Sequence, residues 1–150
     1  MKEQFNLNVI DHSQELQTIK EKYGEFYFRD ERSTQEAAAL WGGLETNKHG
    51  VATSVIIETL IKEKGLTVEI KLARTLKDHW LIGLNVHAST YGMGYMPSAW
   101  DREGYADYGS ARKEAIQRLK DYFTRSTSIK EHSEIIRKLT EAQTPQLSFF

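Results

Sequence analysis

Two stretches in the middle of the chain alternate apolar and polar residues, and this pattern constrains the fold more than any other feature of the sequence. The apolar positions are Leu66, Val68, Ile70 and Leu72, followed by Trp80, Ile82, Leu84 and Val86. A period of two is typical of strands that bury one face. Residues 75–78 lie between the two stretches and supply a turn, so the sequence predicts an antiparallel hairpin whose apolar face needs a covering layer.

Helical patterns occur on both sides of this hairpin. Residues 11–23 follow the helical period with Asp11 as an N-cap, and residues 33–36 form a capping box that would begin a second helix. Ser110 would cap a third helix, and residues 128–131 form a capping box before a fourth. The chain therefore has enough helices to cover a small sheet.

Together these patterns predict an α+β fold. We expect a small antiparallel sheet built on a 66–88 hairpin and packed against helices from both chain ends. The chain has 150 residues, and no linker divides its first 140 residues. This favours a single domain over residues 1–143, followed by a C-terminal peptide tail over residues 144–150.

Three segments have less decisive patterns. Residues 52–64 place apolar side chains at helical spacing, which favours a helix, although their β-branched residues leave a strand possible. Residues 26–28 could form a short strand. Residues 89–109 contain four tyrosines, a tryptophan and a proline, and we expect them to form a protruding aromatic loop.

The charge and the cysteine content exclude several classes of protein. Twenty Lys and Arg against 21 Asp and Glu give a net charge of -1, so no overall positive field attracts DNA or anionic lipid. The chain has no cysteine, which excludes disulfides, thiolate metal sites and thiol nucleophiles. Its N-terminal residues lack the apolar stretch of a signal peptide, and its apolar runs are too short to span a bilayer. We therefore expect a cytoplasmic protein without membrane contact.

No motif in the sequence indicates a catalytic site. The five histidines lack the spacing of metal ligands, and Gly92-Met93-Gly94 lacks the third glycine of a dinucleotide-binding turn. Asp101, Glu103 and Asp107 resemble the acidic residues of an ordinary polar loop. We therefore expect a non-enzymatic protein with no catalytic residues, no metal and no cofactor. A pocket that gathered two carboxyl groups, or a histidine and a carboxyl group, would favour an enzyme instead.

A cluster of aromatic residues with one arginine lies within residues 89–109. Rigid aromatic side chains and arginine are common in binding surfaces. We therefore expect a ligand or partner surface formed by Tyr91, Tyr95, Trp100, Arg102 and Tyr105. The rings could instead cover one face of the hairpin.

Basic residues are frequent in the region of the last two helices. The possible DNA contacts there are Arg112, Lys113, Arg118, Lys120, Arg125 and Lys130. Such side chains bind phosphate groups when they face a nucleic acid, although a solvated helix face is the commoner explanation of such a run.

The last five residues carry the most specific pattern. Gln146, Leu147, Ser148, Phe149 and Phe150 follow a helix-breaking proline. This pentapeptide resembles the motif by which bacterial DNA polymerases, repair proteins and phage or plasmid replication factors bind the sliding clamp, commonly Gln-Leu-Ser/Asp-Leu-Phe. The resemblance implies that Gln146 is a polar anchor, that Leu147, Phe149 and Phe150 enter an apolar groove, and that Ser148 is a spacer. The tail could instead pack on its own domain.

A second resemblance covers residues 79–115, which are similar to small modules of phage and plasmid proteins. Together the two resemblances imply a phage, plasmid or DNA-metabolism accessory protein that is tethered to the bacterial DNA sliding clamp by its C-terminal peptide. Its body would contact DNA or a protein partner through the aromatic loop and the basic helices. The alternative is an anti-defence protein that blocks a host nuclease complex or sequesters a small nucleotide signal. Its pocket would be formed by Tyr91, Tyr95, Trp100 and Arg102.

Overall fold

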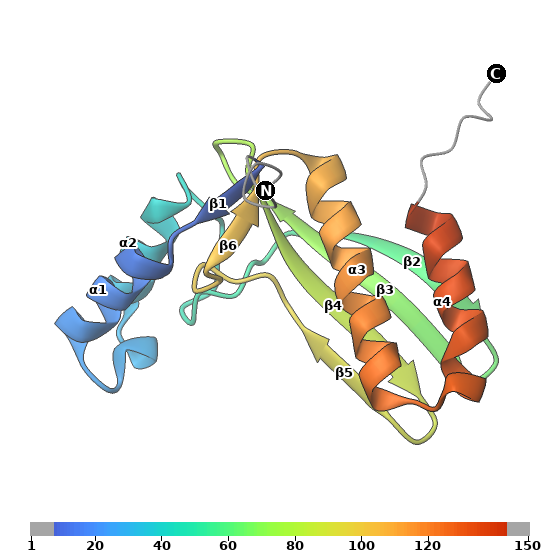
Figure 1. Cartoon of the computed structure of the whole chain (residues 1–150). Helices are drawn as coiled ribbons and strands as arrows, with labels where there is room; N and C mark the ends of the chain where they lie inside the picture. The colour runs from blue at the N-terminus through green and yellow to red at the C-terminus, as the bar shows by residue number, and fades with distance from the viewer. Residues whose placement is uncertain (1–7, 144–150) are drawn as a thin grey trace.

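The computed structural model describes residues 8–143, whose strands form one antiparallel sheet with helices packed against it (Figure 1). The strands are β1 (Val9–Asp11), β2 (Ile56–Glu63), β3 (Leu66–Arg74), β4 (Trp80–Ala88), β5 (Gly92–Tyr95) and β6 (Glu103–Tyr105). The helices are α1 (Ser13–Tyr23), the 3-10 helix η2 (Tyr27–Arg29), α2 (Glu31–Leu40), α3 (Tyr108–Ser126) and α4 (Ile129–Gln143). The strand order is β1-β6-β4-β3-β2, and β5 pairs with β4. The predicted α+β fold, with helices from both ends of the chain, is confirmed.

The hairpin predicted over residues 66–88 forms the centre of the sheet. β3 and β4 pair along their whole length, and Ile70 lies opposite Leu84 with both side chains buried. The turn between the strands is held by Thr75, whose hydroxyl oxygen accepts hydrogen bonds from the backbone N–H groups of Lys77 and His79 at 3.3 and 3.1 Å. The local turn chemistry and the apolar pattern therefore favour the same register.

The helix favoured for residues 52–64 is wrong, because Ile56–Glu63 forms the edge strand β2 beside β3. A tight turn at Gly65 joins the two strands, and the φ of 80° at Gly65 lies in a region that glycine enters without steric cost. A β-bulge interrupts the pairing between Thr59 and Ile61. The β-branched residues of this stretch fit a pleated strand once a partner strand is available.

Two other local predictions are corrected by the structure. Residues 26–28 do not form a strand, since the chain makes the 3-10 helix η2 there. The second helix begins before the expected capping box, because Asp30 caps it by accepting a hydrogen bond from the backbone N–H of Arg32. The hydroxyl group of Ser33 instead points back and donates to the carbonyl oxygen of Asp30 at 2.7 Å.

The larger core lies between one face of the sheet and the helices α3 and α4, which run side by side across that face (Figure 1). Its buried side chains include Val68, Ile70, Leu72, Ile82, Leu84 and Val86 from the sheet and Ala115, Ile116, Leu119, Phe123 and Leu139 from the helices. Burying an aliphatic or aromatic side chain of this size stabilises the fold by about 1.5–3 kcal/mol. This interface therefore holds both helices on the sheet.

A second core lies at one end of the sheet, on the opposite face, where α1 and α2 pack. Ala73 and Leu81 are paired neighbours in β3 and β4. They face away from the larger core, because adjacent residues of a strand point to opposite sides. Both are buried with Leu16 and Ile19 of α1 and with Trp41, which follows α2.

Trp41 connects this second core to β6. Its ring is fully buried, and its Nε1 donates a hydrogen bond to the carbonyl oxygen of Ala99 at 3.1 Å. The ring also lies directly against Gly104 of β6, where an added Cβ would be 2.6 Å from Cζ3 of the indole. Glycine is therefore required at this position for the close approach of β6 to Trp41.

Residues 89–109 do not form the protruding loop that we expected. They contain β5 and β6, and both strands pair with the sheet. Pro97, between these strands, is fully buried and lies directly over Gly83 of β4. The glycine- and tyrosine-rich composition of this segment therefore belongs to short strands and close packing.

Asp107, rather than Ser110, is the N-cap of α3. Its carboxylate accepts a hydrogen bond from the backbone N–H of Ser110 at 2.7 Å.

We expect Asp107→Ala to lower the free energy of unfolding by about 1 kcal/mol, because a backbone N–H in the first turn of α3 loses its hydrogen-bond partner. Ser110→Ala should cost less, since the backbone bond to Asp107 remains. Urea denaturation of both variants measures this, and a larger loss in Ser110→Ala would contradict the assignment of the cap.

Candidate functional site around Arg118

The residues of the predicted clamp-binding peptide, Gln146, Leu147, Ser148, Phe149 and Phe150, lie outside the described residues. α4 ends at Gln143. The side chain of Gln143 accepts a hydrogen bond from Nζ of Lys120 in α3 at 2.9 Å. The chain is therefore anchored to the folded body as far as Gln143, directly before the proposed tail.

Three residues of the predicted ligand or partner surface converge on Arg118 of α3. Its guanidinium group donates hydrogen bonds to the hydroxyl oxygens of Tyr95 in β5 at 3.2 Å and Tyr105 in β6 at 3.3 Å. Glu114, one turn earlier in α3, accepts a hydrogen bond from Nε of Arg118 at 3.1 Å. Arg102 lines the same hollow from the segment before β6. Arg118 therefore ties α3 to two strands and faces the third predicted residue.

The hollow beside Arg118 has a volume of about 190 Å³ and is also lined by Asp101, Arg102 and Glu103. The carboxyl group of Asp101 is half-buried, and its Oδ2 accepts a hydrogen bond from the backbone N–H of Ser98 at 3.0 Å. Burial raises the pKa of Asp101 to about 6, although the bond from Ser98 and the charge of Arg118 both lower it. Asp101 thus exchanges a proton in a pH range where an ordinary aspartate stays ionised.

The hollow combines hydrogen-bond donors with this titrating carboxyl group. A guanidinium group has five N–H donors, and Arg118 uses three of them in the bonds described above. Two N–H groups are left to bind a further acceptor. Above pH 6 the carboxylates of Asp101, Glu103 and Glu114 outnumber the two guanidinium groups, so the hollow would select a ligand by hydrogen-bond geometry rather than by positive charge. Carboxyl groups with raised pKa values in clefts are common at functional sites.

Two other residues of the predicted surface, Tyr91 and Trp100, lie elsewhere. The ring of Tyr91 packs at 6.5 Å from Tyr122 and 6.3 Å from Phe123, in the C-terminal part of α3. The ring of Trp100 lies 4.8 Å from that of Tyr27 in η2. The four side chains required by the signal-sequestering alternative therefore do not share one pocket.

Arg112, the first of the residues considered for DNA contact, is engaged within the domain. Its Nε and Nη2 donate to the two carboxylate oxygens of Glu58 in β2 at 2.8 and 2.7 Å. Its Nη1 donates to the carbonyl oxygen of Ala142 in α4 at 2.7 Å. Arg112 therefore connects three elements, and its paired guanidinium group is less free to meet a phosphate than an unpaired one.

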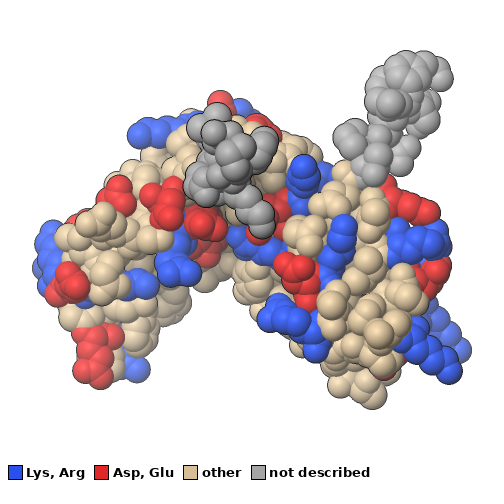
Figure 2. All heavy atoms as spheres, viewed as in Figure 1, with Lys and Arg blue, Asp and Glu red and all other residues tan. Residues whose placement is uncertain are grey.

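Three of the four remaining candidate residues are more accessible than Arg112 and Arg118. Lys113, Arg125 and Lys130 are exposed, and Lys120 is half-buried. On the face shown in Figure 2, basic and acidic side chains are interspersed over the helices. This face therefore offers separate cationic groups rather than a continuous basic patch.

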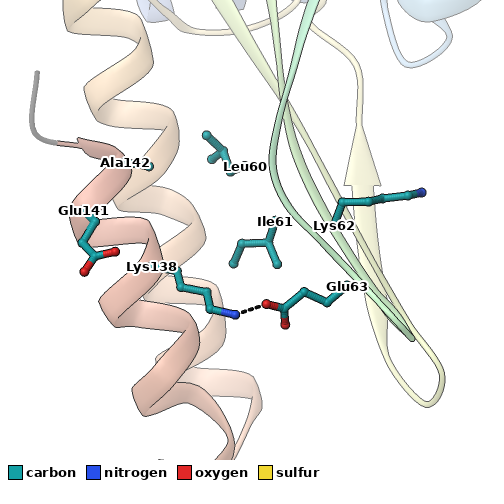
Figure 3. Close-up of a pocket in the computed structure, with 7 residues that line it drawn as sticks. All are labelled: Leu60, Ile61, Lys62, Glu63, Lys138, Glu141 and Ala142. Carbon is teal, nitrogen blue, oxygen red and sulfur yellow. Dashed lines mark hydrogen bonds and ion pairs between the residues drawn. The ribbon is translucent and has the colours of Figure 1, made fainter. Parts of the chain in front are cut away.

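A second hollow of about 340 Å³ lies between β2 and α4 (Figure 3). Leu60 and Ile61 line it on the strand side, and Ala142 lines it on the helix side. Across it, Lys138 of α4 forms an ion pair with Glu63 of β2. This pair links the helix to the edge strand, so the hollow belongs to the packing of α4.

No protein-family model, curated protein or solved structure matches this chain. Within residues 8–143, no helix is both long enough and apolar enough to cross a membrane. The same residues contain no group of three or more His, Asp or Glu side chains placed to hold a metal ion. The role of the hollow beside Arg118 is therefore inferred from its own geometry.

The sequence contained no signal that distinguishes Asp101 from the other acidic residues of its segment. Its environment arises because Ser98 and Arg118, from different parts of the chain, meet around its carboxyl group. The sequence does carry a signal for a second binding surface, because aromatic and basic side chains are interleaved in residues 20–32. Two of these aromatic residues, Phe26 and Phe28, are exposed in the structure.

Proposed function

We propose that this protein is a non-enzymatic accessory of phage, plasmid or bacterial DNA metabolism that is tethered to the DNA sliding clamp by its C-terminal peptide. The observation that carries the proposal is the sequence Gln-Leu-Ser-Phe-Phe at residues 146–150, which resembles the clamp-binding motif. Short peptides that enter a groove typically bind with a Kd of the order of micromolar. The peptide would therefore determine where the protein acts, and the folded body would determine what it contacts there.

Two features of the folded body support a binding function. The hollow beside Arg118 has unused guanidinium N–H groups and a carboxyl group that titrates near pH 6. The exposed side chains of Lys113, Arg125 and Lys130 provide separate cationic groups on the last two helices. The exposed cations suit a partner with spaced negative charges, such as the phosphate groups of DNA, and the N–H donors of the hollow suit a hydrogen-bond acceptor of that partner.

Calorimetric titration of the protein into purified bacterial sliding clamp tests the tether. We expect the full chain to bind with a Kd of the order of micromolar. The double variant Phe149→Ala/Phe150→Ala should bind at least about thirtyfold more weakly, because burying each ring in an apolar groove is worth about 2–3 kcal/mol. Deletion of residues 144–150 should abolish the binding.

Ser148→Ala is the matched control, since the resemblance makes Ser148 a spacer. This variant should bind the clamp as the full chain does. The proposal that the C-terminal peptide binds the clamp would be overturned if the unchanged protein did not bind the clamp. It would also be overturned if the double phenylalanine variant bound the clamp as tightly as the control.

A further inference from the structure

The structure exposes an aromatic surface in the turn between α1 and α2, at the opposite end of the molecule from α4 (Figure 1). We call this turn, residues 26–29, the aromatic tip. The side chain of Phe26 is 56% exposed and that of Phe28 is 43% exposed, with ring centroids 6.2 Å apart. Exposing two neighbouring phenylalanine rings to water costs free energy, and a pair of exposed rings is typical of a binding surface.

The aromatic tip is held in place by contacts behind it. The ring of Tyr27 packs edge-on at 4.8 Å from the ring of Trp100. The hydroxyl hydrogen of Ser33 in α2 is shared between the carbonyl oxygens of Tyr27 and Asp30. Phe26 and Phe28 are therefore presented on an ordered turn, which reduces the entropy that binding would remove.

Two cations accompany the rings. The guanidinium group of Arg29 lies 5.1 Å from the ring centroid of Phe26 and 5.6 Å from that of Phe28. Nζ of Lys20 lies 5.2 Å from the ring centroid of Tyr27. Neither cation forms an ion pair with another residue in the range 8–143. Their charges are therefore available to an anionic group beside the rings.

Acidic residues limit the electrostatic contribution of this region. Residues 20–32 contain four basic and four acidic side chains. Two of the basic groups are neutralised, since Arg32 pairs with Asp30 and Lys22 pairs with Glu36. A ligand of the aromatic tip would consequently gain more from contact with the rings than from long-range attraction.

We propose that the aromatic tip binds single-stranded nucleic acid, with bases stacked on Phe26 and Phe28 and with phosphate groups beside Arg29 and Lys20. Every base has a flat π face that can stack on a ring, and these faces are accessible in a single strand but covered in a duplex. Cation–π contacts of arginine reinforce such stacking. This adds a partner to the proposed function and does not depend on the clamp peptide.

Fluorescence anisotropy with labelled oligonucleotides tests the proposal. The probes are oligo(dT) and oligo(rU) of about 15 nucleotides, a length that covers one binding site, and a DNA duplex of the same length. We expect the protein to bind both single strands more tightly than the duplex. The variant Phe26→Ala/Phe28→Ala should bind oligo(dT) at least about tenfold more weakly, because a stacking contact is lost.

Ile129→Ala is the matched control, because Ile129 is an apolar residue that is 78% exposed and lies at the start of α4. It should bind oligo(dT) as the full chain does. Arg29→Gln should reduce the slope of log affinity against log salt by about 0.7, since one phosphate contact to a single strand is removed. Circular dichroism of each variant checks that the fold is intact.

The proposal is overturned if the double phenylalanine variant binds oligo(dT) as tightly as the control. It is also overturned if the full chain binds no single strand, which is the result expected if the tip anchors another protein. Tighter binding to the duplex would likewise contradict it. Clamp titration separates the two proposals, because the double variant should still bind the clamp. If the unchanged protein binds oligo(dT) but not the clamp, the clamp proposal alone fails, and if it binds the clamp but not oligo(dT), the proposal for the aromatic tip alone fails.

Discussion

Replacing Trp41 with alanine should lower the free energy of unfolding by about 3–5 kcal/mol, the usual cost of removing a large aromatic side chain from a core. The ring is fully buried between α2, β6 and the segment before β6. Its removal would leave a cavity and would also leave the carbonyl oxygen of Ala99 without the indole N–H. Urea denaturation followed by circular dichroism measures the change.

Leu76→Ala is the matched control for this variant. Leu76 is 85% exposed, so its truncation should alter stability by less than about 0.5 kcal/mol. Trp41→Phe should fall between the two, because it keeps a ring in the core and loses the hydrogen bond to Ala99. A loss in Trp41→Ala no larger than that in Leu76→Ala would show that the second core contributes little to the fold.

Replacing Asp101 with asparagine should stabilise the protein at pH 7.5, which is the opposite of the usual effect of a substitution at a half-buried, hydrogen-bonded residue. Burial raises the pKa of Asp101 to about 6, against an ordinary value of 3.8. This difference corresponds to about 3 kcal/mol at neutral pH, an upper value for the gain. The amide oxygen of asparagine can still accept the hydrogen bond from Ser98, and no charge is buried.

The free energy of unfolding should depend on pH in the direction set by the raised pKa of Asp101. Between about pH 4 and pH 6 the folded protein binds a proton at Asp101 that the unfolded chain has released. The free energy of unfolding therefore contains a contribution from Asp101 that is fully present below pH 4 and is lost as the pH rises to 6. At pH 4 the unchanged protein, with Asp101 protonated, and the Asp101→Asn variant should be equally stable. The comparison at pH 4 is therefore the control for the comparison at pH 7.5. A pH-independent difference between the two proteins would contradict the assigned cause.

If Asp101→Asn stabilises the protein at neutral pH as expected, the result would support a binding role for the hollow beside Arg118. Carboxyl groups with raised pKa values are common in clefts that bind ligands or transfer protons. Calorimetry of ligands at pH 5.5 and 7.5, in two buffers of different ionisation enthalpy, would detect proton uptake at Asp101 on binding.

The central hairpin could be predicted because β3 and β4 each keep a strict alternation and each bury one face. β2 could not be predicted in the same way. Its β-bulge between Thr59 and Ile61 inserts an extra residue, which breaks the period of two and leaves apolar side chains at helical spacing. Only the partner strand β3 shows that this stretch is extended, and pairing between strands is not visible in the period of one segment.

The contacts around Arg118 also could not be predicted from the sequence. Tyr95 and Tyr105 could be recognised as candidates from their composition alone. The sequence did not show that Arg118 lies between them, because 23 and 13 residues separate it from these tyrosines. The exposure of Phe26 and Phe28 could not be predicted for a different reason, since a short aromatic run is also typical of a strand and the exposure of a turn depends on the whole fold.

The placement of Trp41 also has a consequence for the order in which the chain can fold during synthesis. The hydrogen-bond acceptor of its indole, Ala99, lies 58 residues later, and the side chain of Asn8 bonds to Ser110, which lies 102 residues later. The hairpin of β3 and β4 joins adjacent segments, so it can form as soon as it leaves the ribosome. The apolar faces of α1 and α2 are covered only after Ala73, Leu81 and Ala99, which complete the second core, have been made. Until then the N-terminal part of a nascent chain would remain a substrate for chaperones and proteases, although it is made first.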